Sequence, residues 1–217
     1  MRLLPRLWRA ERRLERALAA WNAGNYGVAL DLWAPLAQAG VARAQSNMGA
    51  AFLEGRGVAR DPDKAATWLR LAAEQDDPDA QDMLSWMKLL GGGCPQDYEG
   101  ARQWAEKAAA HGRAAAMARL GDIHHNALGV ERSAERAAQW WRRAAVLGHP
   151  EAQVMLGAAY LAGRGVARDP VEALHWLLRG EAGGAGELAV GFLREARAHA
   201  KPSQRADAER RATQPLP

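Results

Sequence analysis

Residues 44–70 read AQSNMGAAFLEGRGVARDPDKAATWLR, and residues 152–178 repeat much of this stretch as AQVMLGAAYLAGRGVARDPVEALHWLL. Four such copies follow one another in steps of 36 residues, without insertion or deletion. Three columns of residues mark the period: Ala44, Ala80, Ala116 and Ala152; Gly57, Gly93, Gly129 and Gly165; Trp68, Trp104, Trp140 and Trp176. A fixed period of this size indicates a solenoid in which one small unit is stacked repeatedly.

Each repeat is predicted to contain two helices. The first has the apolar spacing of one helix face, at Ala44, Met48, Ala51 and Phe52. Gly55 ends this helix, and Asp61 then offers an N-cap oxygen before Pro62, which suits the first position of a second helix. A glycine inside a helix is unfavourable, so we expect Gly49 and its equivalents to allow close contact with the second helix, beside the tryptophan.

The composition favours an all-α fold. The chain is rich in alanine, which loses no side-chain entropy in a helix, and only ten of its 217 residues are prolines. We expect a single repeat domain over residues 1–217. Its parts are capping helices and a degenerate repeat over 1–43, repeats over 44–79, 80–115, 116–151 and 152–187, capping helices over 188–213, and a disordered tail over 214–217.

The fourth copy carries the pattern Ala-x3-Leu-Gly-x2-Tyr-x2-Gly-x-Gly-Val-x2-Asp-x3-Ala-x2-Trp from Ala152 to Trp176. This pattern resembles the Sel-one-like repeat, a relative of the tetratricopeptide repeat with a longer loop inside each repeat. The resemblance implies a right-handed α/α superhelical solenoid. It also implies a non-catalytic adaptor that holds a protein or peptide partner in its concave groove. The copy departs from the pattern at Gly180 and Glu181, where two alanines are expected.

By analogy with tetratricopeptide arrays, the groove is lined by those positions of the first helices that the core does not use. Trp86 occupies such a position, outside the tryptophan column. Two readings of Trp86 stay open: a large aromatic side chain that anchors a partner, or a filler of space in an irregular copy. The candidate partner-binding residues are Asp82, Met83, Trp86, Arg119, Asp122, His125 and Asn126.

We predict no catalytic residue, no metal site and no cofactor. His124 and His125 are adjacent and therefore point about 100° apart on a helix, whereas two ligands on one helix need i, i+4 spacing. Cys94 is the only cysteine, and no base is placed beside it. The resemblance implies an alternative function, an envelope-associated small-ligand receptor or a hydrolase of the β-lactam-binding type. Relatives of that type carry a cysteine pair in each repeat.

The charge of the chain lies mainly in its ends. The formal net charge is +4, with +4 in residues 1–21 and +3 in residues 194–211, so the repeats between them are slightly acidic. No basic stripe follows the repeats, and nucleic-acid binding is therefore not predicted. The arginine-rich ends leave attachment to an anionic surface as a third reading, which salt would weaken.

The chain has no apolar run long enough to cross a bilayer, and arginines interrupt the apolar residues of its first ten positions. We therefore expect a cytoplasmic protein without a transmembrane segment, or a periplasmic one if an export signal is missing from the sequence. A monomer or a weak homodimer is expected, because an exposed cap face could pair two arrays.

Overall fold

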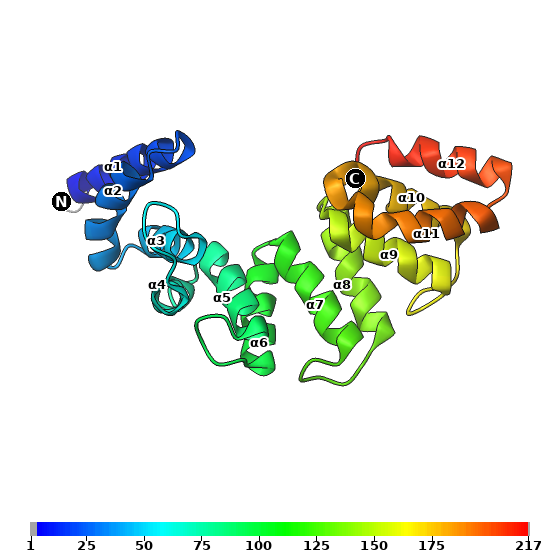
Figure 1. The fold of residues 1–217 in the computed structure, drawn as a ribbon, viewed down its shortest axis with the longest axis horizontal. Coiled ribbons are helices and arrows are strands. Elements are labelled where there is room, and N and C mark those ends of the chain that lie inside the picture. The colour runs from blue at the N-terminus through cyan, green and yellow to red at the C-terminus, as the bar shows by residue number, and fades with distance from the viewer. Residues whose placement is uncertain (1–3, 217) are drawn as a thin grey trace. The chain divides into compact units, whose positions relative to one another are not determined.

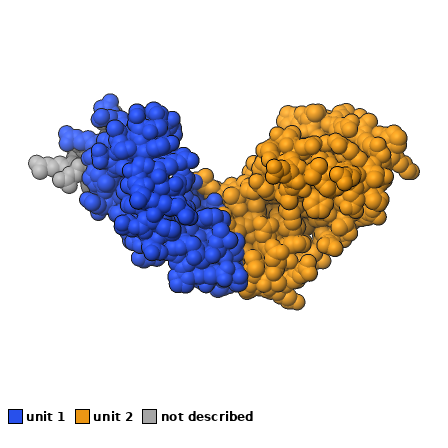
Figure 2. Space-filling model, viewed as in Figure 1, with its two compact units in different colours: residues 1–108 blue, residues 109–217 orange. Residues whose placement is uncertain are grey.

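The computed structural model describes residues 4–216, with side chains from Arg9 onward. Residues 1–3 of the predicted N-terminal cap and Pro217 of the predicted tail lie outside the described residues. The chain divides into two compact units, unit 1 up to Ala108 and unit 2 from Ala109 onward (Figure 2). Each unit is a stack of helix pairs.

The helices follow one another along the chain as the repeat predicts (Figure 1). Unit 1 contains α1 (Leu4–Asn22), α2 (Tyr26–Gln38), α3 (Ala42–Glu54), α4 (Pro62–Ala73) and α5 (Pro78–Leu90). The boundary between the units falls within α6 (Tyr98–Ala110). Unit 2 contains α7 (Ala114–Asn126), α8 (Ala134–Val146), α9 (Pro150–Ala162), α10 (Pro170–Gly180), the π-helical turn η1 (Glu181–Ala185), α11 (Gly186–His199) and α12 (Pro202–Ala212). No strand occurs within residues 4–216, and the predicted all-α fold is confirmed.

Local sequence explains where the helices begin and end. A carboxylate oxygen of Asp61 accepts the amide N–H of Lys64 at 3.0 Å, and Asp169 caps α10 by accepting two amide N–H groups. The first helices α3 and α9 end on Gly55 and Gly163, both in the left-handed region. Ala127 ends α7 in the same conformation, at φ 57°, although it is not a glycine.

The tryptophan column lies at the edge of the core. Trp68, Trp104 and Trp140 are only half-buried, whereas Trp176 is buried, and a basic side chain covers two of the half-buried rings. Lys107 and Arg143 lie 4.2 Å and 4.3 Å from the ring centroids of Trp104 and Trp140. In every repeat the next residue of the second helix is buried in the core, at Leu69, Ala105, Trp141 and Leu177, and at Trp33 in the degenerate repeat.

The mid-helix glycines allow the close helix contact that their position predicted. A Cβ atom added to Gly49 would lie 2.6 Å from Cγ of Leu69, and one added to Gly157 would lie 2.7 Å from Cγ of Leu177. The expectation that the tryptophan packs beside the glycine is wrong. One residue along a helix turns a side chain by about 100°, so the residue after Trp68 faces the glycine instead.

A buried glutamine repeats between neighbouring helix pairs. The side-chain amides of Gln45, Gln81 and Gln153 donate to carbonyl oxygens near the ends of the preceding second helices. The distances are 3.1 Å to Ala37, 3.3 Å to Ala73 and 3.0 Å to Ala145. Each of these carbonyls also accepts a backbone N–H from the turn that follows the helix, so the glutamine is its second donor and links two repeats.

The second glycine of each loop lets one repeat approach the previous one. Gly93 and Gly165 have φ angles of +78° and +71°. A Cβ atom on Gly93 would lie 2.2 Å from the carbonyl oxygen of Pro62, and one on Gly165 would lie 2.1 Å from that of Ala134. Backbone therefore contacts backbone at these points, and no side chain fits between them.

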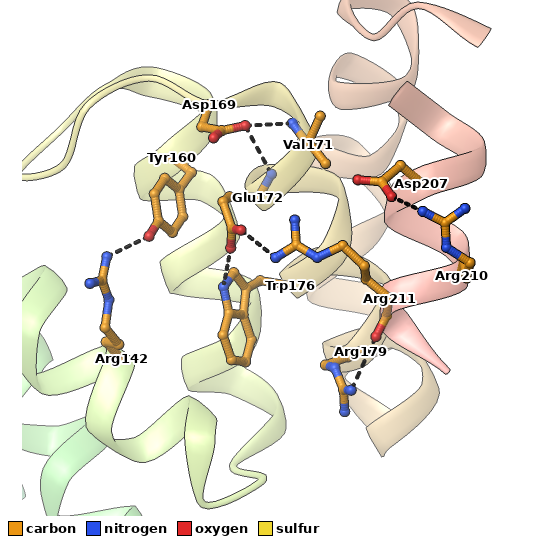
Figure 3. A network of polar contacts seen from close by, with 10 residues as sticks. All are labelled: Arg142, Tyr160, Asp169, Val171, Glu172, Trp176, Arg179, Asp207, Arg210 and Arg211. Carbon is orange, nitrogen blue, oxygen red and sulfur yellow. Dashed lines mark hydrogen bonds and ion pairs between the residues drawn. The ribbon is translucent and has the colours of Figure 1, made fainter. Parts of the chain in front are cut away.

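The C-terminal helix α12 is fastened to α10 by a polar network (Figure 3). The carboxylate of Glu172 accepts hydrogen bonds from the Trp176 indole at 3.1 Å and from the guanidinium of Arg211. Arg179 donates to the carbonyl oxygens of Arg211 and Gln214 at the end of α12. The network holds α12 in place, and Ala208 of this helix packs into the buried apolar cluster at the end of the stack.

Replacing Arg211 with alanine should loosen α12 without unfolding unit 2. The Arg211–Glu172 pair is half-buried and charge-assisted, so its loss should cost about 1 kcal/mol. Amide hydrogen exchange in α12 should become faster, while exchange in α9 should not change. The control is Arg210→Ala, which removes the more exposed Arg210–Asp207 pair from the same helix. Equal acceleration of exchange by both variants would contradict this role of Arg211.

Acid should weaken unit 2 through His175. This side chain is buried in α10, and burial lowers its pKa below the ordinary value of 6.5. The neighbouring cations Arg211 and Arg179 lower the pKa further, whereas Glu172 and Asp207 raise it. As the pH falls below 6.5, the unfolded chain takes up a proton before the folded chain does, so stability decreases.

The measurement is urea unfolding of unit 2 at pH 7.5 and pH 5.5, for the intact chain and for His175→Gln. Glutamine is the residue at the equivalent positions 103 and 139. The variant should lose less stability on acidification than the intact chain. An unchanged pH dependence would show that other groups are responsible.

Candidate partner-binding site

The predicted residues of unit 1 lie together on α5. Trp86 is 41% exposed, and Leu90, one turn further along the same face, is 58% exposed. Asp82 and Met83 are half-buried on the preceding turn. The structure thus places a large aromatic side chain and an aliphatic one side by side at the surface of a rigid helix.

The predicted residues of unit 2 lie on α7. Arg119, Asp122 and His125 are half-buried, and Asn126 is exposed at the end of the helix. Asp122 accepts a hydrogen bond of 3.0 Å from the indole N–H of Trp141. The ring of His125 lies 5.2 Å from the Trp141 ring, tilted by 50°. Asp122 and His125 are therefore brought together around a tryptophan that the sequence analysis did not include.

Trp141 is held by residues particular to the third repeat. It stands where the other repeats have Leu69, Ala105 and Leu177, and only 3% of it is exposed. Gly121 makes room for the ring, because an added Cβ would lie 2.3 Å from Cδ1 of Trp141. A buried indole N–H needs an acceptor, and the carboxylate of Asp122, the residue after Gly121, accepts it.

Burial raises the pKa of Asp122. The hydrogen bond from Trp141 and the nearby His125, Arg119 and His149 act in the opposite direction and favour the carboxylate. Burial outweighs these interactions, so the pKa of Asp122 remains above its ordinary value.

A pocket of about 150 Å³ opens beside Trp141 within unit 2. Its apolar lining comes from α8, α9 and α11: Trp141, Met155, Phe192 and the alanines Ala134, Ala158, Ala159 and Ala162. His125 and Arg164 are its polar residues. The pocket combines an aromatic surface, an adaptable thioether and a guanidinium group.

Arg164 is exposed, and its backbone N–H donates to the carbonyl oxygen of Ala159 at 3.0 Å. Its guanidinium makes no hydrogen bond or ion pair with any residue in the described part of the chain. The equivalent Arg56 in the first repeat pairs with Glu54, with 2.7 Å between Nε and a carboxylate oxygen. Ala162 stands where Glu54 stands in the first repeat. The same substitution therefore leaves the guanidinium unpaired and contributes a small side chain to the pocket.

Of the pocket residues, only His125 was a candidate from the sequence; those that sequence reasoning missed include Trp141, Met155, Arg164 and Phe192. The period directs attention to what the repeats share, and Trp141 stands out only when its column of leucine and alanine is compared across copies. That comparison could have found Trp141. The contribution of Phe192 could not have been found in this way, because α11 follows the last complete repeat.

The remaining chemistry of the described residues is limited. No group of three His, Cys, Asp or Glu side chains within residues 4–216 is placed to hold a metal ion. Burial raises the pKa of the Cys94 thiol, which disfavours the reactive thiolate. No helix in the same range is long and apolar enough to cross a membrane.

Four consecutive segments match the family of the Sel1 repeat, over residues 42–77, 78–112, 114–149 and 150–184. The chain belongs to the Sel1 repeat family. The resemblance noted in the fourth repeat is thereby confirmed and extends over all four copies. Sel1 repeat proteins are generally non-catalytic scaffolds for protein interactions.

Solved structures with the same architecture support this assignment. A protective antigen present in uropathogenic Escherichia coli strains, which displays an SLR fold, is 28% identical with a TM-score of 0.78. The match covers 94% of this Sel1 repeat chain and 45% of the antigen, so the chain spans less than half of that protein. A Sel1 repeat protein from Oxalobacter formigenes is 26% identical with a TM-score of 0.76, covering 89% and 87% of the two chains. No curated protein matches the sequence.

Proposed function

We propose that this Sel1 repeat chain is a non-catalytic scaffold that binds a protein or peptide partner on the exposed faces of its first helices. The observation that carries the proposal is the exposed pair Trp86 and Leu90 on α5. Tryptophan is among the residues most enriched in interface hot spots, and its burial by a partner removes a large apolar area from water. The exposure of Trp86 favours the anchor reading over that of a space filler.

The surroundings of Trp86 suit protein recognition. Met83 and Asp82 extend the surface along α5 and add an adaptable apolar group and a polar one. A helix face of this kind fits an extended segment or a partner helix that offers one apolar anchor and a few polar contacts. α5 itself is fixed by its buried side chains and by the Gln81 bond to α4, so little ordering is required on binding.

The test is affinity capture from a lysate of the source cell with three immobilised chains: the intact chain, Trp86→Ala and Leu147→Ala. Leu147 is the matched control, because it is 54% exposed but lies at the end of α8, a second helix. A photo-crosslinking amino acid at Met83 identifies the proteins that touch α5 directly. We expect crosslinked proteins to be lost with Trp86→Ala and kept with Leu147→Ala. Identical capture by all three folded chains would overturn the assignment of this surface.

A further inference from the structure

We infer that the pocket beside Trp141 binds one apolar side chain of a peptide in which the neighbouring group is a carboxylate. The inference deepens the proposed function, because it names the chemistry of a partner segment that unit 2 would hold. The packing of the fold accounts for the buried Trp141, but it leaves the space beside the ring open and gives the guanidinium of Arg164 no partner among the described residues. The apolar lining defines the side chain that the pocket accepts, and Arg164 defines the carboxylate beside it.

The size of the pocket suits a single side chain. A volume of about 150 Å³ is comparable to a cavity that holds one benzene ring. Pockets that enclose whole small molecules are roughly 300–1,000 Å³ and bury most of the ligand. The pocket in unit 2 is therefore too small to enclose a drug-sized molecule, whereas one anchor residue of a longer chain fills it.

The lining favours an aromatic or large aliphatic side chain. Trp141 and Phe192 supply aromatic surface, and the flexible Met155 adapts to differently shaped groups. Ala158 and Ala162 keep the entrance free, since both are partly exposed and carry no more than a methyl group. An apolar side chain entering here loses its contact with water without displacing any residue of the core.

The charge of the pocket favours a carboxylate next to that side chain. Arg164 offers unpaired donors in a planar group that matches a carboxylate in bidentate geometry. His125 adds a second polar group on α7. The acidic Asp122 accepts the indole N–H of Trp141, so one of its oxygens is already engaged. A carboxylate of the peptide would take the place beside Arg164 that Glu54 takes beside Arg56 in the first repeat.

A peptide is favoured over a small carboxylic acid, because the pocket holds a single side chain and the surface around it can contact the neighbouring residues of a longer chain. The surrounding surface comes from separate helices, α7, α9 and α11, whose exposed side chains can contact residues on either side of the anchor. The carboxylate can belong to an aspartate or glutamate side chain or to the C-terminus of the peptide. These sources share one chemistry, and the selection described below separates them.

The experiment is selection of random eight-residue peptides against the immobilised full chain, with one library ending in a free carboxylate and one ending in an amide. Enriched peptides are resynthesised and their dissociation constants measured by fluorescence anisotropy. We expect an aromatic or large aliphatic residue next to an acidic residue, or at a free C-terminus. Enrichment of peptides without an acidic group would overturn the inference, and so would a failure to enrich any peptide.

Two matched variants test where the selected peptides bind. Ala162→Glu rebuilds the acidic neighbour of the first repeat, so it should occupy Arg164 and weaken binding by about 10-fold or more. Ala198→Glu adds the same charge at an exposed position near the end of α11, and it should leave binding unchanged. Equal affinities for the two variants would contradict the assignment of the site.

A third variant and a small-acid competitor complete the test. Ala158→Leu fills the pocket entrance without changing any charge, and it should also weaken binding. N-acetylphenylalanine that competes as strongly as a whole peptide would replace the peptide reading with that of a small-acid receptor. Capture through Trp86 reports on unit 1 alone, so its persistence when peptide selection fails would leave the proposed function standing. Loss of both would remove the proposed function as well.

Discussion

Replacing Gly165 with alanine should destabilise unit 2 by about 2–5 kcal/mol. Two effects add up at this position. The φ angle of +71° is unfavourable for any residue with a Cβ atom, and that atom would lie 2.1 Å from the carbonyl oxygen of Ala134. The obstacle is backbone at the start of α8, so no side chain can rotate away to make room. The measurement is urea unfolding followed by tryptophan fluorescence.

Gly148→Ala separates the two effects. Gly148 also has a positive φ, +84°, but an added Cβ atom would meet nothing within 4 Å. This variant should lose only the cost of the left-handed conformation, about 1–2 kcal/mol. The difference between the two losses of unfolding free energy reports the cost of the clash between the loop of the fourth repeat and α8 of the third. Similar losses for both would mean that the loop of the fourth repeat can move away from α8.

Trp141→Ala should have the other large effect, a loss of about 3–5 kcal/mol. The substitution removes a buried aromatic ring, leaves a cavity against Gly121 and takes the hydrogen-bond donor from Asp122. Peptide binding in unit 2 should be lost as well, because the ring lines the pocket. Urea unfolding and the anisotropy assay check the two expectations separately.

Trp141→Leu restores the residue of the first and fourth repeats and isolates the polar part of the loss. Leucine fills part of the space, but Asp122 then lies half-buried without its indole donor, and burial already raises the pKa of this carboxyl group. Adding Asp122→Ala supplies the residue found at positions 50 and 158 and should recover stability. In this double-mutant cycle, additive losses would show that the Asp122–Trp141 bond contributes little.

Most of the helix pattern could be predicted because its causes are local. Asp61 and Asp169 cap helices through residues two or three positions away, and Gly55 ends a helix through its own backbone conformation. His124 is buried in α7, at the repeat position that Phe52 and Tyr160 occupy in other copies. The ends of these helices depend on neighbouring residues and not on contacts between repeats, so they can be predicted from a single copy of the repeat.

The inward face of the second helix could not be read from the period alone. The regular column of Trp68 and its equivalents suggested the core, but a regular column shows only that a position is constrained. Its neighbour Leu69 turns out to face the glycine of the first helix. Adjacent residues differ by about 100° in direction, and an error of one position therefore moves a residue from the core to its edge.

The candidate site shows the opposite limitation. Asp122 and His125 were found because they vary on a face that the core leaves free, yet their partner Trp141 belongs to another helix. Distances across helices depend on packing, which no spacing rule within one helix contains. The pocket also needs Phe192 from beyond the last repeat. The residues of the proposed site are thus ones at which a repeat departs from the other copies.

The residues around Trp141 occupy positions that have equivalents in every repeat, so the same cluster could be built in another copy. Gly121, Asp122, His125 and Trp141 correspond to Gly49, Ala50, Leu53 and Leu69 in the first repeat, where the necessary glycine is already present. Ala50→Asp, Leu53→His and Leu69→Trp would therefore place the same tryptophan cluster in the first repeat. The copy would carry the aspartate–tryptophan hydrogen bond but not the pocket, because Arg164 and Phe192 come from other parts of unit 2. A repeat scaffold can thus exchange parts of its core between copies without changing its architecture.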